Sequence, residues 1–252
     1  MRLSRRHPRY RSLRVRADLG EALRAGLVVP EGLIAQGRGE AFDYLLGERS
    51  SPAARRAARV AARWLVAAER PVVSVNGNVA ALAAREVAEL QRAIPGLRVE
   101  VNLFHRTPAR AAAVARALRR AGVHNVLGVR PSARIPHLPS DRAWVDARGI
   151  ALADVCLIPL EDGDRTEALR RLGKRVISID LNPLSRTSRR ADLPIVDELT
   201  RALRGISGAA RNLPRPARRR TFPPYDASAA LAEALATIDR RLTRLAGRRP
   251  PR

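Results

Sequence analysis

Polar and charged side chains gather at four places, each directly after a short apolar run. These groups are residues 76–78, 104–106, 161–165 and 180–187. Short apolar runs bounded by turn-forming residues are typical of buried strands. The carboxyl ends of parallel strands meet at one edge of a sheet, where ligands bind. We therefore expect the four groups to form one site.

The third group is acidic, with three carboxylates within four residues beside Arg165. Two carboxylates at such spacing can hold a Mg²⁺ ion that also contacts phosphate oxygens. Asp162 and Asp164 are therefore candidate metal ligands. For Asp164 the alternative is that its carboxylate caps the helix that begins there, which would leave Glu161 and Asp162 unexplained.

The other three groups indicate a nucleotide beside an anionic substrate. Asp180 at a strand tip is placed to accept hydrogen bonds from a ribose, and residues 185–187 can cradle phosphates. His105 and Arg106 precede a helix start, which is a favourable place for an anion. Ordinary loop and turn roles are the alternatives for these two residues and for residues 76–78. The clusters alone do not name a reaction.

Helical and strand patterns alternate from residue 51 onward, which is typical of a parallel sheet covered by helices. We expect strands at residues 71–75, 98–103, 125–129, 154–159, 175–180 and 193–196. The apolar residues are mainly Ala, Val, Leu and Ile, with 3% aromatic residues, as suits such packing. The predicted fold class is α/β, with a Rossmann-like, mostly parallel sheet and helices on both faces.

Other segments flank this sheet. An N-terminal helical segment is expected, with pieces at residues 18–25 and 40–46 and a break at residues 37–39. Residues 130–147 contain three prolines without periodicity and predict an ordered loop. The expected organisation is a main domain over residues 1–204, a linker over 205–225 and a basic C-terminal helix and tail over 226–252.

The net charge of +24 is concentrated at the chain ends. Met1–Arg16 carries seven arginines and no acid, whereas residues 211–252 carry eleven arginines and three acids. Such ends either bind polyanions, such as nucleic acid, or are merely solvated. Aromatic platforms for stacking single-stranded bases are scarce.

Several site classes are not expected. Lys174, the only lysine, lacks the spacing of a phosphate-binding P-loop, and the four histidines lack the spacing of zinc ligands. Cys156 lies in an apolar run, which predicts a buried and inert thiol. No apolar run approaches the roughly 20 residues of a membrane span, and no secretory signal is evident. We therefore expect a cytoplasmic protein without membrane contacts.

The order and spacing of seven motifs resemble the archaeal phosphopantothenate synthetases, also called 4-phosphopantoate–β-alanine ligases. The motifs are residues 7–16, 32–35, 37–45, 75–78, 102–106, 159–169 and 180–187. The resemblance implies a homodimer that joins 4-phosphopantoate to β-alanine with ATP and Mg²⁺. The implied route passes through an acyl adenylate and releases AMP and diphosphate, on the way to coenzyme A.

The resemblance also implies site residues. ATP contacts fall on Arg16, Arg38, Asp180, Leu181, Asn182, Arg186, Thr187, Glu198 and Leu199. From their positions in the clusters, the expected substrate contacts are Asn76, His105, Arg106 and Arg165. The β-alanine amine has an ordinary pKa of about 10 and must lose a proton before it attacks. Asp162, Asp164 and His105 are the candidate proton acceptors.

Two other functions compete with this interpretation. One is a nucleic-acid-binding protein that uses its Arg-rich termini and keeps the sheet as a scaffold. The other is a nucleotide-dependent enzyme of another kind, such as a dehydrogenase. The glycines at residues 37–39 lack the third glycine and the preceding strand of a dinucleotide-binding fingerprint, which disfavours the dehydrogenase.

Overall fold

The computed structural model describes residues 4, 6–213 and 221–247. Its centre is a six-stranded sheet in the order β3-β2-β1-β6-β7-β8, with every neighbouring pair parallel. The strands are β1 (Pro71–Val75), β2 (Arg98–Val101), β3 (Val126–Leu127), β6 (Val155–Pro159), β7 (Arg175–Ile179) and β8 (Leu193–Ile195). The order reverses between β1 and β6, which is where such sheets bind ligands. The predicted Rossmann-like α/β class is confirmed.

Four helices cover one face of the sheet: α3 (Pro52–Ala67), α4 (Gly77–Ala93), α5 (Pro108–Arg120) and α8 (Leu199–Arg211). Helix α8 packs against both α3 and α4. Val155 and Leu157 of β6 join the core on this face, whereas Cys156 and Ile158 join the core on the other. This alternation follows from the period of two along a strand. The sheet is therefore buried on both faces, as parallel sheets require.

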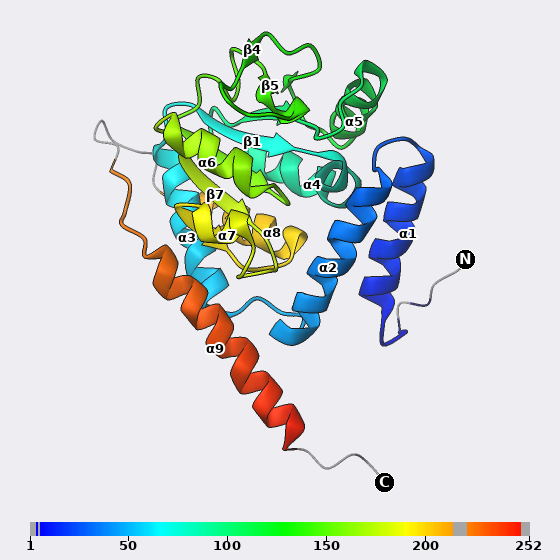
Figure 1. Cartoon of the computed structure of the whole chain (residues 1–252), viewed down its shortest axis with the longest axis vertical. Coiled ribbons are helices and arrows are strands. Elements are labelled where there is room, and N and C mark those ends of the chain that lie inside the picture. Colours follow the sequence, from blue (N-terminus) through cyan, green and yellow to red (C-terminus); the bar gives the residue numbers. More distant parts are fainter. Residues whose placement is uncertain (1–3, 5, 214–220, 248–252) are drawn as a thin grey trace.

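The other face is covered by α6 (Gly163–Arg171) and by the segment that follows β3. Figure 1 shows this segment above the sheet, where it contains a small antiparallel ribbon of β4 (Ala133–Arg134) and β5 (Trp144–Val145). The loop predicted for residues 130–147, called the insertion below, thus has more regular structure than expected. It also contains a short 3₁₀ helix, Asp141–Ala143. Its apolar residues pack onto α6 and the face of the sheet, which fixes its place.

The N-terminal segment forms two helices beside the sheet, α1 (Tyr10–Arg24) and α2 (Pro30–Leu46) (Figure 1). The predicted break at residues 37–39 is wrong, because α2 continues through both glycines. A Cβ added at Gly39 would lie 3.7 Å from Leu181 Cδ1, so the small residue permits a close approach to the loop after β7. Tertiary packing here outweighs the low helix propensity of glycine.

The C-terminal helix α9 (Ala227–Ala246) confirms the predicted helix and packs on α2 and α3 (Figure 1). The predicted linker is corrected in part, because residues 205–211 belong to α8. Gly205 and Gly208 suggested a linker, but Ile206 and Ala210 are buried and hold the helix on the sheet. Residues 214–220 lie outside the described part of the chain. The segment before α9 is anchored where Trp64 Nε1 donates to the Pro223 carbonyl at 2.8 Å.

Two further expectations concern Cys156 and membrane contact. Cys156 is buried, as predicted, and burial raises the pKa of its thiol to about 12. Among the residues that the structure describes, no helix combines the length and apolarity that a bilayer span requires.

Candidate functional site

A cavity of about 690 Å³ lies at the carboxyl ends of β1, β2, β6 and β7, with α2 along one side. All four polar groups that the sequence singled out contribute to its lining. The sequence-predicted residues that line it are Arg38, Asn76, His105, Asp162, Asp180, Leu181, Asn182 and Thr187. The strand order explains this convergence, because β1 and β6 are adjacent and each has a further site-bearing strand on its outer side.

Asn76 ties the tips of β1 and β6 together at the point where the strand order reverses. Its Oδ1 accepts the Val79 amide at 3.0 Å and so caps α4. Its Nδ2 donates to the carbonyls of Pro159 at 3.2 Å and Leu160 at 2.9 Å. Asn78 Nδ2 reaches α2 by donating to the Gly32 carbonyl at 2.8 Å. These bonds hold the start of α4 at the wall of the cavity.

A buried charge cluster supports the loop after β6. Arg142 Nη1 lies 2.6 Å from Glu161 Oε1, and Arg165 Nη1 contacts the other Glu161 oxygen. Arg165 also donates to Ser74 Oγ at 2.9 Å, and its side chain has no solvent exposure. Burial raises the pKa of Glu161, and the two guanidinium groups oppose that rise. Arg165 therefore has structural partners and does not line the cavity, contrary to the direct substrate contact that we expected.

The two aspartates predicted as metal ligands have separate partners. Asp162, not Asp164, caps α6, because its Oδ1 accepts the Arg165 amide at 2.8 Å. Its Oδ2 lies 3.0 Å from Arg142 Nε. Asp164 is exposed in the first turn of α6, where it pairs with Arg186 at 2.7 Å. Within the described ranges, no three His, Cys, Asp or Glu side chains are grouped to hold a metal. Each of the two carboxylates therefore has a cationic partner, and their expected role as Mg²⁺ ligands stays a prediction.

The loop after β7 presents a second set of polar groups. Asp180 is largely buried, and its Oδ1 accepts the Asn182 amide at 2.9 Å. Burial raises the pKa of Asp180, whereas a hydrogen bond from Ser185, the Asn182 amide and the charge of Arg38 lower it. Thr187 Oγ1 donates to the Glu161 carbonyl at 2.7 Å. The loops after β6 and β7 are thus fixed to each other along the cavity.

Four residues that the resemblance assigned to ATP do not line this cavity. Arg186 begins the short helix α7 (Arg186–Arg190) and is exposed. Glu198 caps α8 by accepting the amides of Thr200 at 2.8 Å and Arg201 at 3.0 Å, and Leu199 is buried behind it.

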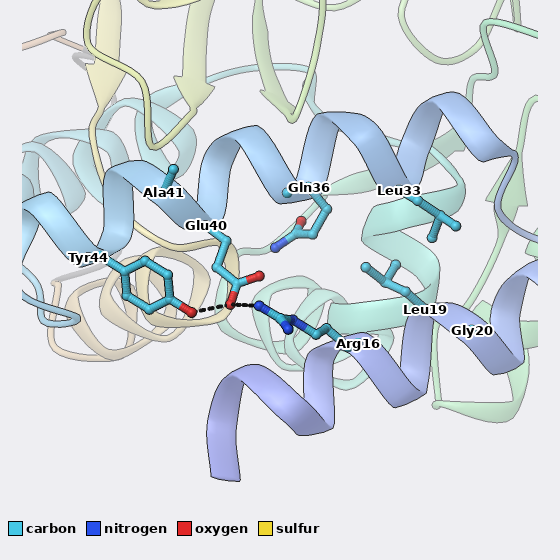
Figure 2. A pocket seen from close by; sticks show the side chains of 9 residues that line it. Arg16, Leu19, Gly20, Leu33, Gln36, Glu40, Ala41 and Tyr44 are labelled. Carbon is cyan, nitrogen blue, oxygen red and sulfur yellow. Dashed lines mark hydrogen bonds and ion pairs between the residues drawn. The ribbon is translucent and has the colours of Figure 1, made fainter. Parts of the chain in front are cut away.

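The fourth, Arg16, lines a separate pocket of about 410 Å³ between α1 and α2. Figure 2 shows Arg16 of α1 reaching up to Glu40 of α2, which Tyr44 also contacts. The nitrogen–oxygen distance of the Arg16–Glu40 pair is 3.1 Å. Gln36 and Ala41 border both this pocket and the larger cavity. Within one chain, α2 therefore lies between the two spaces.

The cations beside the tip of β2 differ from those expected. Arg106 Nη2 donates to the carbonyls of Gly128 at 2.7 Å and Val129 at 2.8 Å, and Arg106 does not line the cavity. Arg110 and Arg142 do line it, and sequence reasoning missed both. Arg110 lies three residues after the cap of α5, so its nearness to the predicted site was a usable signal. Arg142 lies in the insertion, where no local pattern marks it.

Comparison with known proteins identifies the family of this chain. Residues 53–241 match the family model described as phosphopantothenate/pantothenate synthetase. A 4-phosphopantoate–β-alanine ligase of Thermococcus onnurineus is 49% identical over 250 residues, which cover 98% of this chain and 95% of that protein. Ligases of the same name from Methanosarcina mazei and Methanospirillum hungatei are 48% identical over 243 residues and 55% identical over 201 residues. These two matches cover 95% and 80% of this chain, and 95% and 82% of the respective relatives. The chain belongs to the phosphopantothenate/pantothenate synthetase family.

Proposed function

We propose that this chain is an ATP-dependent 4-phosphopantoate–β-alanine ligase. The observation that carries the proposal is the convergence of four strand-tip loops into one cavity, in a chain about half identical to ligases of that name along nearly its whole length. The cavity offers cations, amide groups and carboxylates for anionic substrates. The family match favours this reaction over nucleic-acid binding by the basic termini.

The proposed reaction has two steps. A carboxylate oxygen of 4-phosphopantoate attacks the α-phosphorus of ATP, and diphosphate leaves. The β-alanine nitrogen then attacks the acyl carbon of the acyl adenylate, the bond to the AMP oxygen breaks, and the nitrogen loses a proton. A free carboxylate has no adequate leaving group, and adenylation supplies one. Donors held in place by the fold stabilise the charge that develops on the phosphate oxygens.

We assign the nucleotide to the half of the cavity formed by the loop after β7 and by α2. Asp180 can accept hydrogen bonds from the ribose, and Arg38 and Thr187 lie where phosphate oxygens would pass. Leu181 and Asn182 complete this wall. Arg186 is assigned a phosphate contact through its place at the end of the same loop. The roles of Arg16, Glu198 and Leu199 rest on the resemblance alone.

We assign the organic acid to the half formed by β1 and β2, where Asn76 and His105 lie. Of the three candidate proton acceptors, Asp164 is outside the cavity lining and Asp162 already faces Arg142. His105 is exposed at the cavity and is our proposed acceptor for the β-alanine proton. Neither step of the proposed reaction is assigned to a metal ion.

We also propose that the chain is a homodimer. Helix α2 carries two exposed large side chains, Ile34 at 63% exposure and Tyr44 at 41%, which a second copy could cover. Light scattering of the purified chain is expected to give about twice the monomer mass. A monomeric mass that persists under assay conditions would contradict the dimer without affecting the proposed chemistry.

The reaction itself is tested by product analysis. The full chain supplied with ATP, 4-phosphopantoate and β-alanine is expected to form AMP and phosphopantothenate in equal amounts. Formation of ADP, or the absence of phosphopantothenate, would contradict the proposal. Asp180→Asn should raise the KM for ATP about 10-fold, since a charge-assisted hydrogen bond is lost. The exposed Asp239 on α9 provides the matched control, and Asp239→Asn should leave that KM unchanged.

A further inference from the structure

Two arginines from different elements line the cavity. Arg110 belongs to the first turn of α5, and Arg142 belongs to the insertion. The Arg142 side chain is only 8% exposed, and Arg110 is half-buried. Arg142 has Glu161 and Asp162 as anionic partners, whereas Arg110 pairs with no carboxylate in the described part of the chain. Guanidinium groups are seldom held at low exposure without anionic partners, so the place of Arg110 in a ligand cavity raises the question of what it binds.

Each arginine uses two of its three guanidinium nitrogens for contacts within the protein. Arg110 Nε donates to the Leu27 carbonyl at 3.2 Å, and its Nη1 donates to the His105 carbonyl. Arg142 Nη1 pairs with Glu161, and its Nε lies 3.0 Å from Asp162 Oδ2. Each guanidinium is therefore held in place, although Arg142 Nε, which is buried, makes no hydrogen bond among the described residues.

Neither Nη2 atom donates to an acceptor in the described part of the chain. Both arginines line the cavity, where a bound ligand could accept hydrogen bonds from these nitrogens.

Electrostatics favours an anion between these side chains. The pKa of Arg110 is lowered, first by burial and second by the positive charge of Arg142, with Glu31 as a weaker opposing charge. A Cβ added at Gly77 would lie 2.9 Å from Arg110 Nη2, which places this nitrogen against the start of α4.

We propose that Arg110 and Arg142 bind the phosphoryl group of 4-phosphopantoate. This inference rests on the proposed ligase function. A phosphoryl group carries up to two charges and several acceptor oxygens, which match two separate guanidinium donors. The carboxylate end of the substrate then extends towards the loops after β6 and β7, where the nucleotide is assigned.

The rival anion is a phosphate of the nucleotide itself. For Arg110 the sheet order argues against it, because β2 and β1 lie on one side of the reversal point and β7 lies on the other. Arg110 follows β2, whereas Asp180 and Thr187 follow β7. A kinetic experiment separates the two anions, since each substrate has its own KM.

Steady-state AMP formation is measured for the wild type, Arg110→Gln, Arg110→Lys and Arg142→Lys, with Arg116→Gln as the control. Arg116 is exposed on the same helix as Arg110, outside the lining of the cavity. Arg110→Gln should raise the KM for 4-phosphopantoate about 10- to 100-fold, the effect of losing a hydrogen bond to a charged group. The lysine variants keep the positive charge but lose the planar guanidinium group with its fixed N–H donors, so smaller increases in that KM are expected. The KM values for ATP and β-alanine should stay within about twofold.

Pantoate, which lacks the phosphoryl group, gives the decisive comparison. Arg110→Gln should lower kcat/KM for 4-phosphopantoate about 10-fold more than it lowers kcat/KM for pantoate, so that the preference for 4-phosphopantoate over pantoate falls with the variant. An unchanged preference, or an increase in the KM for ATP instead, would overturn the inference. A variant that merely damages the fold lowers activity with both acids equally and also leaves the preference unchanged. If the wild type forms no AMP with either acid, the proposed function fails instead.

Discussion

Arg142 Nη1 lies 2.6 Å from Glu161 Oε1, and both side chains are almost completely excluded from solvent. The contact joins the insertion to the loop after β6, across the wall of the cavity. Asn102 Nδ2 reinforces it by donating to the Arg142 carbonyl at 3.2 Å. Site geometry and fold stability therefore depend on the same few buried groups.

Neutralising Glu161 should destabilise the fold strongly. The Glu161→Gln variant leaves Arg142 and Arg165 buried without their shared counter-charge, and breaking a buried pair costs about 3–5 kcal/mol. Urea unfolding followed by circular dichroism measures the loss in the free energy of unfolding. Asp239→Asn, an exposed acid-to-amide control, should change it by less than about 0.5 kcal/mol. Equal effects of the two changes would show that the cluster is not stabilised by this charge.

Glu100 should make stability depend on pH. Its carboxylate is fully buried and accepts the amides of Asp146 at 2.9 Å and Ile150 at 2.6 Å. Burial raises its pKa to about 7, from 4.5 without the fold. The folded chain thus binds the proton more tightly than the unfolded chain.

The contribution of Glu100 to stability is therefore fully present below pH 4.5 and is lost as the pH rises to about 7. The total change is about 3 kcal/mol. Glu100→Gln cannot ionise, so its free energy of unfolding should vary less over this interval than that of the wild type. Parallel curves for the two proteins in urea titrations at several pH values would contradict the assignment.

Gly77 allows a close contact that a larger residue would disrupt. A Cβ at this position would lie 2.1 Å from the Leu27 carbonyl oxygen and 2.9 Å from Arg110 Nη2. Gly77→Ala should cost about 1–3 kcal/mol of stability, as overpacking does. It should also raise the KM for 4-phosphopantoate. At Gly208 of α8 an added Cβ meets nothing within 4 Å, so Gly208→Ala is expected to be neutral or stabilising.

Arg186 and Arg190 offer a matched pair on α7. Both are exposed and both pair with acids of α6, but only Arg186 begins the helix directly after the loop assigned to the nucleotide. Arg186→Ala should weaken ATP binding about 10-fold, whereas Arg190→Ala should not. Calorimetric titration with ATP measures both. Similar affinities for the two variants would remove the phosphate contact proposed for Arg186.

Much of the fold could be predicted because its signals are local. Both bounds of β1 were predicted correctly, since Pro71 begins the strand and the turn-forming Asn76 follows its last residue. α2 was broken in the prediction because glycine propensity cannot reveal its close approach to Leu181. α7 was missed because five residues are too short for a periodic pattern.

The same difference between local signals and tertiary packing decides which site residues could be predicted. Residues next to strand ends, such as Asn76 and Asp180, were found because sequence position alone places them at the sheet edge. Arg142 was missed because its site position depends on the packing of the insertion, 19 residues from Glu161 in sequence. Arg165 was assigned to substrate because sequence cannot distinguish an exposed arginine from a buried one.

The central claim, ligation through an acyl adenylate, is tested most directly with 4-phosphopantoate carrying ¹⁸O in its carboxylate. If that carboxylate attacks the α-phosphorus of ATP, the released AMP carries one ¹⁸O atom and the phosphopantothenate amide retains the other. Mass spectrometry of the AMP measures this transfer. Unlabelled AMP, or ¹⁸O in inorganic phosphate together with ADP, would contradict the account.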